Sequence, residues 1–188
     1  MKAILLAGGK GTRLRPLTSN MPKPIVPILN RPFLLYQLDL LRRVGSVDEV
    51  ILSLNYQPDQ IEELIDSLPN LGLKIRYLVE PQPMGTAGAI RFALEFLDDT
   101  VIIFNGDVLA ELDLKAVLQF HRTRGANATI VLKPVENPSA YGLVEVDQDA
   151  NVKRFIEKPG NQKLTCNTIN AGVYVIEPSI LHRIPKDT

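Results

Sequence analysis

Three glycines, a lysine and two arginines lie close together near the start of the chain. The stretch Gly8-Gly9-Lys10-Gly11-Thr12-Arg13-Leu14-Arg15 follows a short apolar run. Glycine lets the backbone approach a ligand closely and adopt positive φ, so that successive N–H groups can converge on an anion. Arginine adds a planar fork of donors suited to phosphate oxygens. This composition predicts a cradle for the phosphates of a nucleotide.

Two standard phosphate-binding loops do not fit this stretch. A P-loop requires Gly-Lys followed by Ser or Thr, but Lys10 is followed by Gly11. The dinucleotide fingerprint would begin at Gly9 and Gly11, and its third glycine is replaced by Leu14. A P-loop NTPase and a Rossmann oxidoreductase are therefore not predicted. The simpler alternative is a glycine-rich turn with solvated basic residues.

Further charged residues follow at positions where they could serve a ligand. Lys23 lies between two prolines, which hold its backbone extended. Glu80 comes directly after the strand predicted at 74–79, and Asp107 follows Asn105 and Gly106 after the strand predicted at 101–104. The carboxyl ends of parallel strands are where open α/β sheets bind ligands. A carboxylate there could share Mg²⁺ with phosphates, although a solvated lysine and a turn-capping aspartate are the plainer interpretations.

The elements that would position these residues alternate along the chain. Apolar runs predict strands at 3–6, 50–54, 74–79, 101–104 and 128–132. Amphipathic segments between them predict helices, with Asn30 and Thr86 as expected caps. Strands alternating with helices at this spacing imply βαβ crossovers and a mainly parallel sheet.

The last third of the chain departs from this alternation. Residues 141–147 and 152–156 alternate in polarity around a turn at 148–151, which predicts an antiparallel hairpin. The hairpin ends in Glu157-Lys158, a pair that could hold sugar hydroxyls and a phosphate, with an exposed ion pair as the simpler interpretation. A further strand is expected at 170–176.

Composition limits the classes of function. The 188 residues suit one domain, with Lys plus Arg and Asp plus Glu equal at 21 each. This balance gives no support for a nucleic-acid or membrane-surface partner. No apolar run approaches the roughly 18 residues of a membrane helix. Cys166 is the single cysteine, so no internal disulfide can form and a cytoplasmic location fits.

Taken together, the chain resembles the sugar-phosphate nucleotidylyltransferases, the nucleotide-sugar pyrophosphorylases, and is most similar to mannose-1-phosphate guanylyltransferases. The resemblance spans the whole chain and follows the family's order. It rests on the Gly-Gly-Lys-Gly-Thr-Arg-Leu-Arg-Pro loop at 8–16, Pro22-Lys23-Pro24, Gly85-Thr86-Ala87-Gly88, Gly106-Asp107, Tyr141-Gly142, Glu157-Lys158-Pro159 and Asn170-Ala171-Gly172.

The resemblance implies a fold, an activity and a set of site residues. The fold is a Rossmann-like three-layer αβα domain over 1–188 with a mixed, mostly parallel sheet, of the nucleotide-diphospho-sugar transferase type. The activity is the formation of an NDP-sugar and pyrophosphate from an NTP and a sugar 1-phosphate. Arg13, Lys23 and Asp107 are implied as catalytic, with Asp107 on Mg²⁺. The implied nucleotide-binding residues are Leu6, Ala7, Gly8, Gly9, Gly11, Thr12, Arg13, Glu80, Gly85 and Thr86, and the implied sugar-phosphate-binding residues are Gly142, Glu157, Lys158 and Asn170.

Glu80 also bears on the choice of base. Thymidylyl- and uridylyl-transferring relatives tend to carry glutamine at this position, and a carboxylate only accepts hydrogen bonds. Guanine offers two adjacent donors, whereas uracil and thymine flank one donor with carbonyl oxygens. GTP is therefore the favoured nucleotide and mannose 1-phosphate the favoured acceptor, with thymidylyl, uridylyl or adenylyl transfer to glucose 1-phosphate as alternatives.

The chain departs from the family pattern at its end. Family members run on to a second metal-binding aspartate, and Asp187 is placed too early to replace it. We therefore expect the domain to be C-terminally truncated. A catalytically incomplete, nucleotide-sugar-binding regulatory subunit stays open as an alternative, and so does a homo-oligomer.

Overall fold

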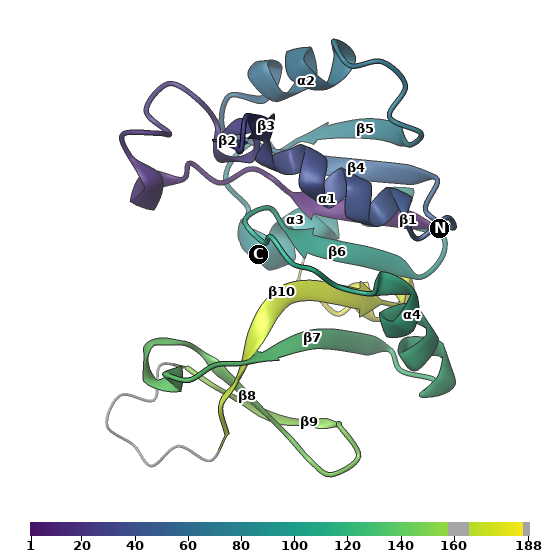
Figure 1. Ribbon diagram of the computed structural model, residues 1–188. Coiled ribbons are helices and arrows are strands. Elements are labelled where there is room, and N and C mark those ends of the chain that lie inside the picture. The colour runs from purple at the N-terminus through teal and green to yellow at the C-terminus, as the bar shows by residue number, and fades with distance from the viewer. Residues whose placement is uncertain (158–165, 186–188) are drawn as a thin grey trace. The chain divides into compact units, whose positions relative to one another are not determined.

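The computed structural model describes residues 1–157 and 166–185. The chain packs as two compact units, Met1–Thr129 with Tyr174–Thr188, and Ile130–Val173. The first unit contains the glycine-rich loop and most of the sheet (Figure 1). The second contains the predicted hairpin. The single domain expected from the chain length is thus built from two separately packed parts.

Parallel strands form the sheet of the first unit. They are β1 (Lys2–Leu6), β4 (Glu49–Leu54), β5 (Lys74–Val79) and β6 (Val101–Asn105), in the order β5-β4-β1-β6-β10. Strand β10 (Thr168–Ile176) contributes its last residues to this unit. Pairing of β1 with β4 and β6 sets Leu6 opposite both Ser53 and Asn105. The parallel pairings confirm the predicted strands. The apolar runs of β1, β4 and β6 suit burial on both faces, whereas β5 is only partly buried.

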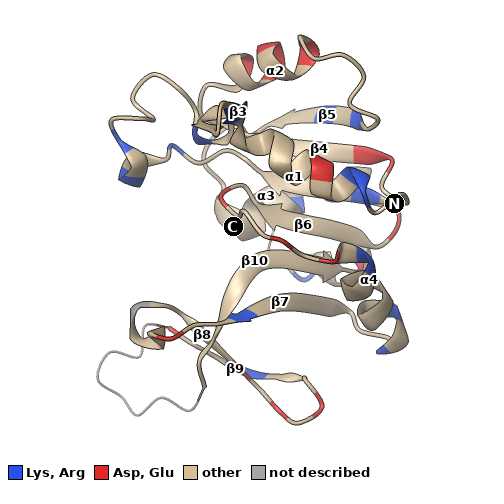
Figure 2. Cartoon of the chain, in the orientation of Figure 1, with Lys and Arg blue, Asp and Glu red and all other residues tan. Residues whose placement is uncertain are grey.

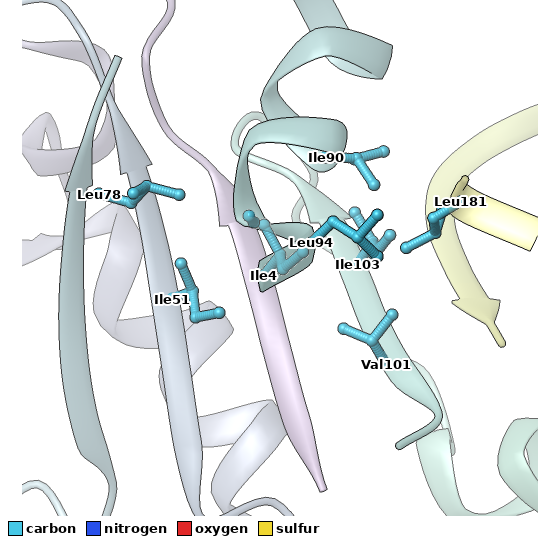
Figure 3. Close-up of a cluster of buried hydrophobic side chains, with 9 residues drawn as sticks. Ile4, Ile51, Leu78, Ile90, Leu94, Val101, Ile103 and Leu181 are labelled. Atoms are coloured by element: carbon cyan, nitrogen blue, oxygen red, sulfur yellow. The ribbon is translucent and has the colours of Figure 1, made fainter. Parts of the chain in front are cut away.

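Helices cover both faces of this sheet. They are α1 (Phe33–Arg42), α2 (Pro58–Asp66), α3 (Gly85–Phe92), α4 (Leu114–Thr123) and α5 (Pro178–Leu181). Figure 1 shows α1 in front of the strands and α3 behind them. On the α3 side, Ile90 and Leu94 pack onto Ile4, Ile51 and Ile103 (Figure 3). The predicted three-layer arrangement is therefore present within this unit.

The predictions of two helix caps are wrong. Asn30 does not cap α1, because Leu29 and Asn30 adopt φ of 50° and 60° in the turn between the short strands β2 (Pro27–Ile28) and β3 (Arg31–Pro32). Asparagine tolerates this left-handed conformation, and α1 begins only at Phe33. Thr86 lies inside the first turn of α3, which begins one residue earlier without a side-chain cap.

The second unit confirms the predicted hairpin. Strands β8 (Leu143–Val146) and β9 (Val152–Ile156) are antiparallel, and β8 also pairs antiparallel with β10. Strand β7 (Ala128–Pro134) pairs with β10. At the hairpin turn, Asp147 accepts hydrogen bonds from the backbone N–H groups of Asp149 and Asn151. These bonds hold the pKa of Asp147 below its usual value.

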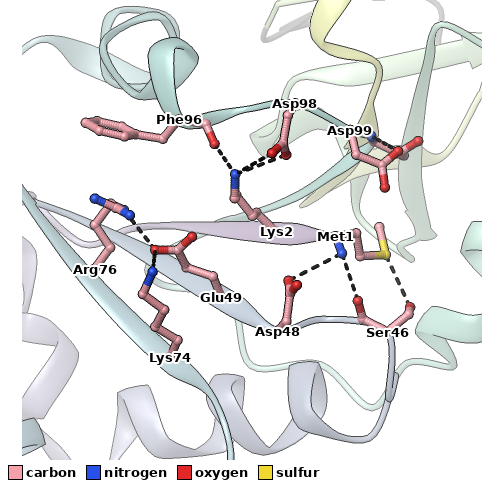
Figure 4. A network of polar contacts seen from close by, with 11 residues as sticks. Met1, Lys2, Ser46, Asp48, Glu49, Lys74, Arg76, Phe96, Asp98 and Asp99 are labelled. Atoms are coloured by element: carbon pink, nitrogen blue, oxygen red, sulfur yellow. Dashed lines mark hydrogen bonds and ion pairs between the residues drawn. The ribbon is translucent and has the colours of Figure 1, made fainter.

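Ion pairs hold the amino ends of the parallel strands (Figure 4). Lys2 donates to Asp98 and to the carbonyl of Phe96. Glu49, which is buried, accepts from Arg76 at 2.8 Å and pairs with Lys74 at 3.2 Å. These charges lie at the opposite end of the strands from Leu6 and Asn105. We therefore assign them to stability.

We expect Glu49→Gln to lower the free energy of unfolding by about 1–2 kcal/mol, because Arg76 and Lys74 lose a buried charged acceptor. Urea denaturation measures this change. Asp98→Asn is the control, since an exposed ion pair contributes little. An equal loss of stability in both variants would contradict the assignment, and nucleotide affinity should be unchanged in either.

Candidate active site

A cavity of about 340 Å³ opens where β1 and β6 end and α3 begins. Every residue that lines it belongs to the first unit. It gathers most of the predicted nucleotide-binding residues together with two of the three predicted catalytic ones. These are Leu6, Ala7, Gly8, Gly9, Glu80, Gly85 and Thr86, with Lys23 and Asp107. Residues far apart in the sequence therefore meet at one edge of the sheet.

The close approach of two strand ends shapes this cavity. The Gly106 N–H donates to the Leu6 carbonyl at 2.9 Å, and the Ala7 N–H donates to the Ser53 carbonyl at 2.8 Å. A Cβ placed on Gly106 would overlap the Leu6 carbonyl oxygen. Only glycine fits there. Asp107 is thereby held directly beside the start of the glycine-rich loop.

Lys23 and Asp107 form an ion pair at the cavity. Their side chains meet at 2.8 Å, and the Asp107 side chain is 43% exposed. Lys23 begins a short 3-10 helix after Pro22, whose extended backbone sets the entry direction. A cation and a hard oxygen ligand are therefore available side by side at a solvent-accessible position.

Glu80 is buried and lines the same cavity. Its carboxylate accepts from the Ser53 hydroxyl at 2.8 Å and from the Met84 N–H at 3.1 Å. Its backbone carbonyl accepts from the Asn55 side chain. A Cβ on Gly8 would lie 3.2 Å from a Glu80 carboxylate oxygen. Glu80 therefore holds the turn that leads into α3, and it keeps lone pairs for a ligand because each carboxylate oxygen can accept two bonds.

The rest of the glycine-rich loop stays outside the cavity lining. Gly11 has φ of 61° and packs against Thr18 and Lys23, and the Thr18 hydroxyl donates to its carbonyl at 2.7 Å. Thr12 and Arg13 form an exposed 3-10 turn. Figure 2 shows Lys and Arg on this loop after β1. Gly11 thus contacts Lys23 without lining the cavity, and Thr12 and Arg13 are not among the lining residues.

The predicted sugar-binding residues lie in the second unit. A Cβ on Gly142 would lie 3.2 Å from a carboxylate oxygen of Glu157, so these two residues are neighbours. Asn170 accepts from the Gly172 N–H at 2.8 Å, which fixes a kink in β10 where Gly172 has φ of 71°. Lys158 lies outside the described residues.

Gln37 is a positioning residue that the sequence did not indicate. It is buried in α1, and its Nε2 donates to the carbonyls of Asn105 at 3.1 Å and Val108 at 2.9 Å. These bonds fix the backbone on both sides of Asp107. The sequence feature that could have indicated this role is a polar residue among the apolar residues on the buried face of α1.

A family model described as "Nucleotidyl transferase" matches residues 2–188. The chain belongs to the nucleotidyl transferase family.

Relatives named as mannose-1-phosphate guanylyltransferases are similar to this chain in sequence. The chain is 43% identical to a probable mannose-1-phosphate guanylyltransferase 1 of Oryza sativa subsp. japonica, over 98% of this chain and 52% of that protein. It is also 43% identical to the mannose-1-phosphate guanylyltransferase catalytic subunit beta of Drosophila pseudoobscura pseudoobscura, over 97% of this chain and 50% of that protein. The chain thus spans about half the length of these curated relatives.

Solved structures extend the comparison to the fold. HddC from Yersinia pseudotuberculosis, also solved in complex with GMP-PN, is 34% identical with a TM-score of 0.81, covering 100% of this chain and 81% of that one. A UDP-glucose pyrophosphorylase complexed with UDP-glucose has a TM-score of 0.84 at 19% identity, over 97% of this chain and 78% of that one. This nucleotidyl transferase therefore has the expected Rossmann-like fold.

We expect Gly106→Ala to weaken nucleotide binding and to destabilise this nucleotidyl transferase by about 1–3 kcal/mol, as overpacking does. The added methyl must push the ends of β1 and β6 apart. Calorimetry and thermal unfolding measure the two effects.

Gly125→Ala is the control for this change. Gly125 has positive φ, unlike Gly106, and has open space around its Cβ position, so alanine strains the backbone without displacing a neighbour. This variant should lose stability and keep nucleotide affinity. Unchanged affinity in Gly106→Ala would show that the cavity does not depend on this contact.

Proposed function

We propose that this chain carries the reaction site of a sugar-1-phosphate guanylyltransferase, which transfers GMP from GTP to mannose 1-phosphate and releases pyrophosphate. The observation that carries the proposal is one cavity that is lined both by Glu80 and by the Lys23–Asp107 pair. The first group suits a guanine base, and the second suits the phosphates of the same nucleotide. Relatives named for this activity and a family member complexed with GMP-PN support the choice.

The proposed reaction needs no protein nucleophile. An oxygen of the sugar phosphate attacks the α-phosphorus, the new P–O bond forms, and the bond to the bridging oxygen breaks with pyrophosphate as leaving group. The chain's part is to position two anions and to neutralise developing charge. We assign that part to Lys23 and to Arg13 from its exposed loop. Gly142, Glu157, Asn170 and Lys158 are assigned to the sugar phosphate.

Mg²⁺ is part of this proposal. Asp107 offers one partly exposed carboxylate, and no group of three or more His, Cys, Asp or Glu side chains that could hold a metal occurs within residues 1–157 and 166–185. This donor set fits Mg²⁺, which is commonly held by one or two carboxylates and substrate phosphates. When bound, Mg²⁺ would neutralise phosphate charge.

The cellular setting completes the proposal. The single cysteine suits a reducing compartment, so we place the reaction in the cytoplasm. None of the helices in the described part of the chain is both long and apolar enough to cross a membrane.

Two assays test the function, each carried out with GTP, dTTP, UTP and ATP in turn. The first measures pyrophosphate release in the presence of mannose 1-phosphate, and the second measures nucleotide binding by calorimetry. Preferred binding and turnover of GTP is the expected result. Tighter binding of dTTP, UTP or ATP would overturn the guanylyl assignment in favour of another nucleotidylyl transfer. GTP binding without pyrophosphate release would favour the alternative, a nucleotide-sugar-binding regulatory subunit.

We expect Lys23→Ala to lower turnover on the order of 10²- to 10³-fold, because removal of one preorganised charge from the reacting phosphate has that effect. Its thermal unfolding should stay close to that of the parent, since a partly exposed ion pair contributes little stability. Lys74→Ala removes an ammonium at the amino ends of the strands and serves as control. Near-normal turnover of Lys23→Ala would reject the role of Lys23.

We expect Glu80→Gln to lower the preference for GTP over UTP on the order of 10-fold, since a bidentate base contact is worth about 1–3 kcal/mol. The amide can accept from Met84 and donate to Ser53, so the turn is retained, and it then presents one donor and one acceptor to the base. The ratio of kcat/KM values for GTP and UTP measures the change. A ratio equal to that of the parent would assign base selection to other groups.

A further inference from the structure

The cavity contains a buried polar atom that none of the roles above uses. The side-chain oxygen of Asn105 is buried and has no hydrogen-bond partner within the described residues. Asn105 is the last residue of β6 and lines the cavity. Leaving a buried acceptor unpaired destabilises a fold. Such a group is retained most readily where a ligand supplies the missing partner.

The direction of the Asn105 side chain follows from the alternation of side chains along β6. Val101 and Ile103 pack into the cluster under α3 (Figure 3). Successive side chains in a strand point to opposite faces, so Asn105 points to the same face as Ile103. The first residues of α3, Gly85 and Thr86, line the cavity on that face.

The register of the sheet places Asn105 between two parts of the proposed nucleotide site. Leu6 is paired with Ser53 on one side and Asn105 on the other, and the Ser53 hydroxyl is bonded to Glu80. Neighbouring strands are about 4.8 Å apart, so Asn105 lies roughly two strand spacings from Ser53 along one row. Asp107, paired with Lys23, follows two residues later.

The ribose is the part of a nucleotide that lies between its base and its phosphates. We propose that the Asn105 amide binds a ribose hydroxyl of the nucleotide. This inference rests on the proposed function, with the base near Glu80 and the phosphates near Lys23. A hydroxyl can both donate and accept, so it satisfies the amide in either orientation. Asn105 thereby becomes a residue that distinguishes nucleotides by a ribose hydroxyl.

Isosteric replacement separates this role from a structural one. Asn105→Leu removes the unpaired polar atom and keeps the branching and the number of heavy atoms of the side chain. The ligand-free variant should unfold at the same or a higher temperature than the parent, because no hydrogen bond is lost. If Asn105 instead held the fold together, the same variant would unfold at a lower temperature.

Calorimetry with GTP, 2′-deoxy-GTP and 3′-deoxy-GTP tests the ribose contact. The parent should bind GTP about 3- to 10-fold more tightly than the analogue that lacks the contacted hydroxyl, which is the effect of one neutral hydrogen bond. In Asn105→Leu, the affinity for GTP should fall to that of this analogue. The contacted hydroxyl is the one missing from the analogue that binds Asn105→Leu as tightly as GTP does.

Gln57→Met is the matched control. Gln57 also has a buried side-chain oxygen without a partner in the described part of the chain, but it does not line the cavity. This variant should keep the parent's preference for GTP over the deoxy analogues. If Asn105→Leu keeps the preference for GTP over the deoxy analogues, or if the parent has no such preference, the role of Asn105 is overturned and the proposed function is not. Absence of binding for every nucleotide would overturn the proposed function as well.

Discussion

The hydrogen bond from the Gly106 N–H to the Leu6 carbonyl is the contact on which the candidate site depends. It continues the pairing of β1 and β6 one residue beyond the strands and leaves no space for a side chain. The glycine-rich loop and Asp107 therefore leave the sheet from adjacent points. Gln37 holds the same turn from α1, through the carbonyls on either side of Asp107. Two independent contacts thus fix one carboxylate.

Most of the parallel strands were predictable from sequence because burial on both faces leaves a direct trace, a run of apolar residues. The carboxyl ends of these strands were predictable for the same reason, and with them the grouping of Glu80 and Asp107. The predictions of the helix caps failed because a cap depends on the backbone conformation of two or three particular residues. Asn30 was available as a cap, but the β2–β3 turn uses its tolerance of positive φ instead.

Arg13, Gln37 and Asn105 show where sequence reasoning stops. Arg13 belongs to the loop that suggested a nucleotide site, yet the structure leaves it exposed outside the cavity lining. Gln37 acts on backbone that is 68 residues away in sequence. The side-chain oxygen of Asn105 is buried without a partner among the described residues, which is a property of the folded chain. In each case the missing information was the three-dimensional surroundings of the residue, which no local pattern encodes.

The division of the chain into two packed units has a consequence for how such a protein can diversify. The residues that line the cavity belong to one unit, whereas Gly142, Glu157 and Asn170 belong to the other. Each unit is compact by itself, so substitutions in one set need not disturb the packing around the other. Under the proposed function, base and sugar preferences can then change separately, and one scaffold can yield many pairings of the two.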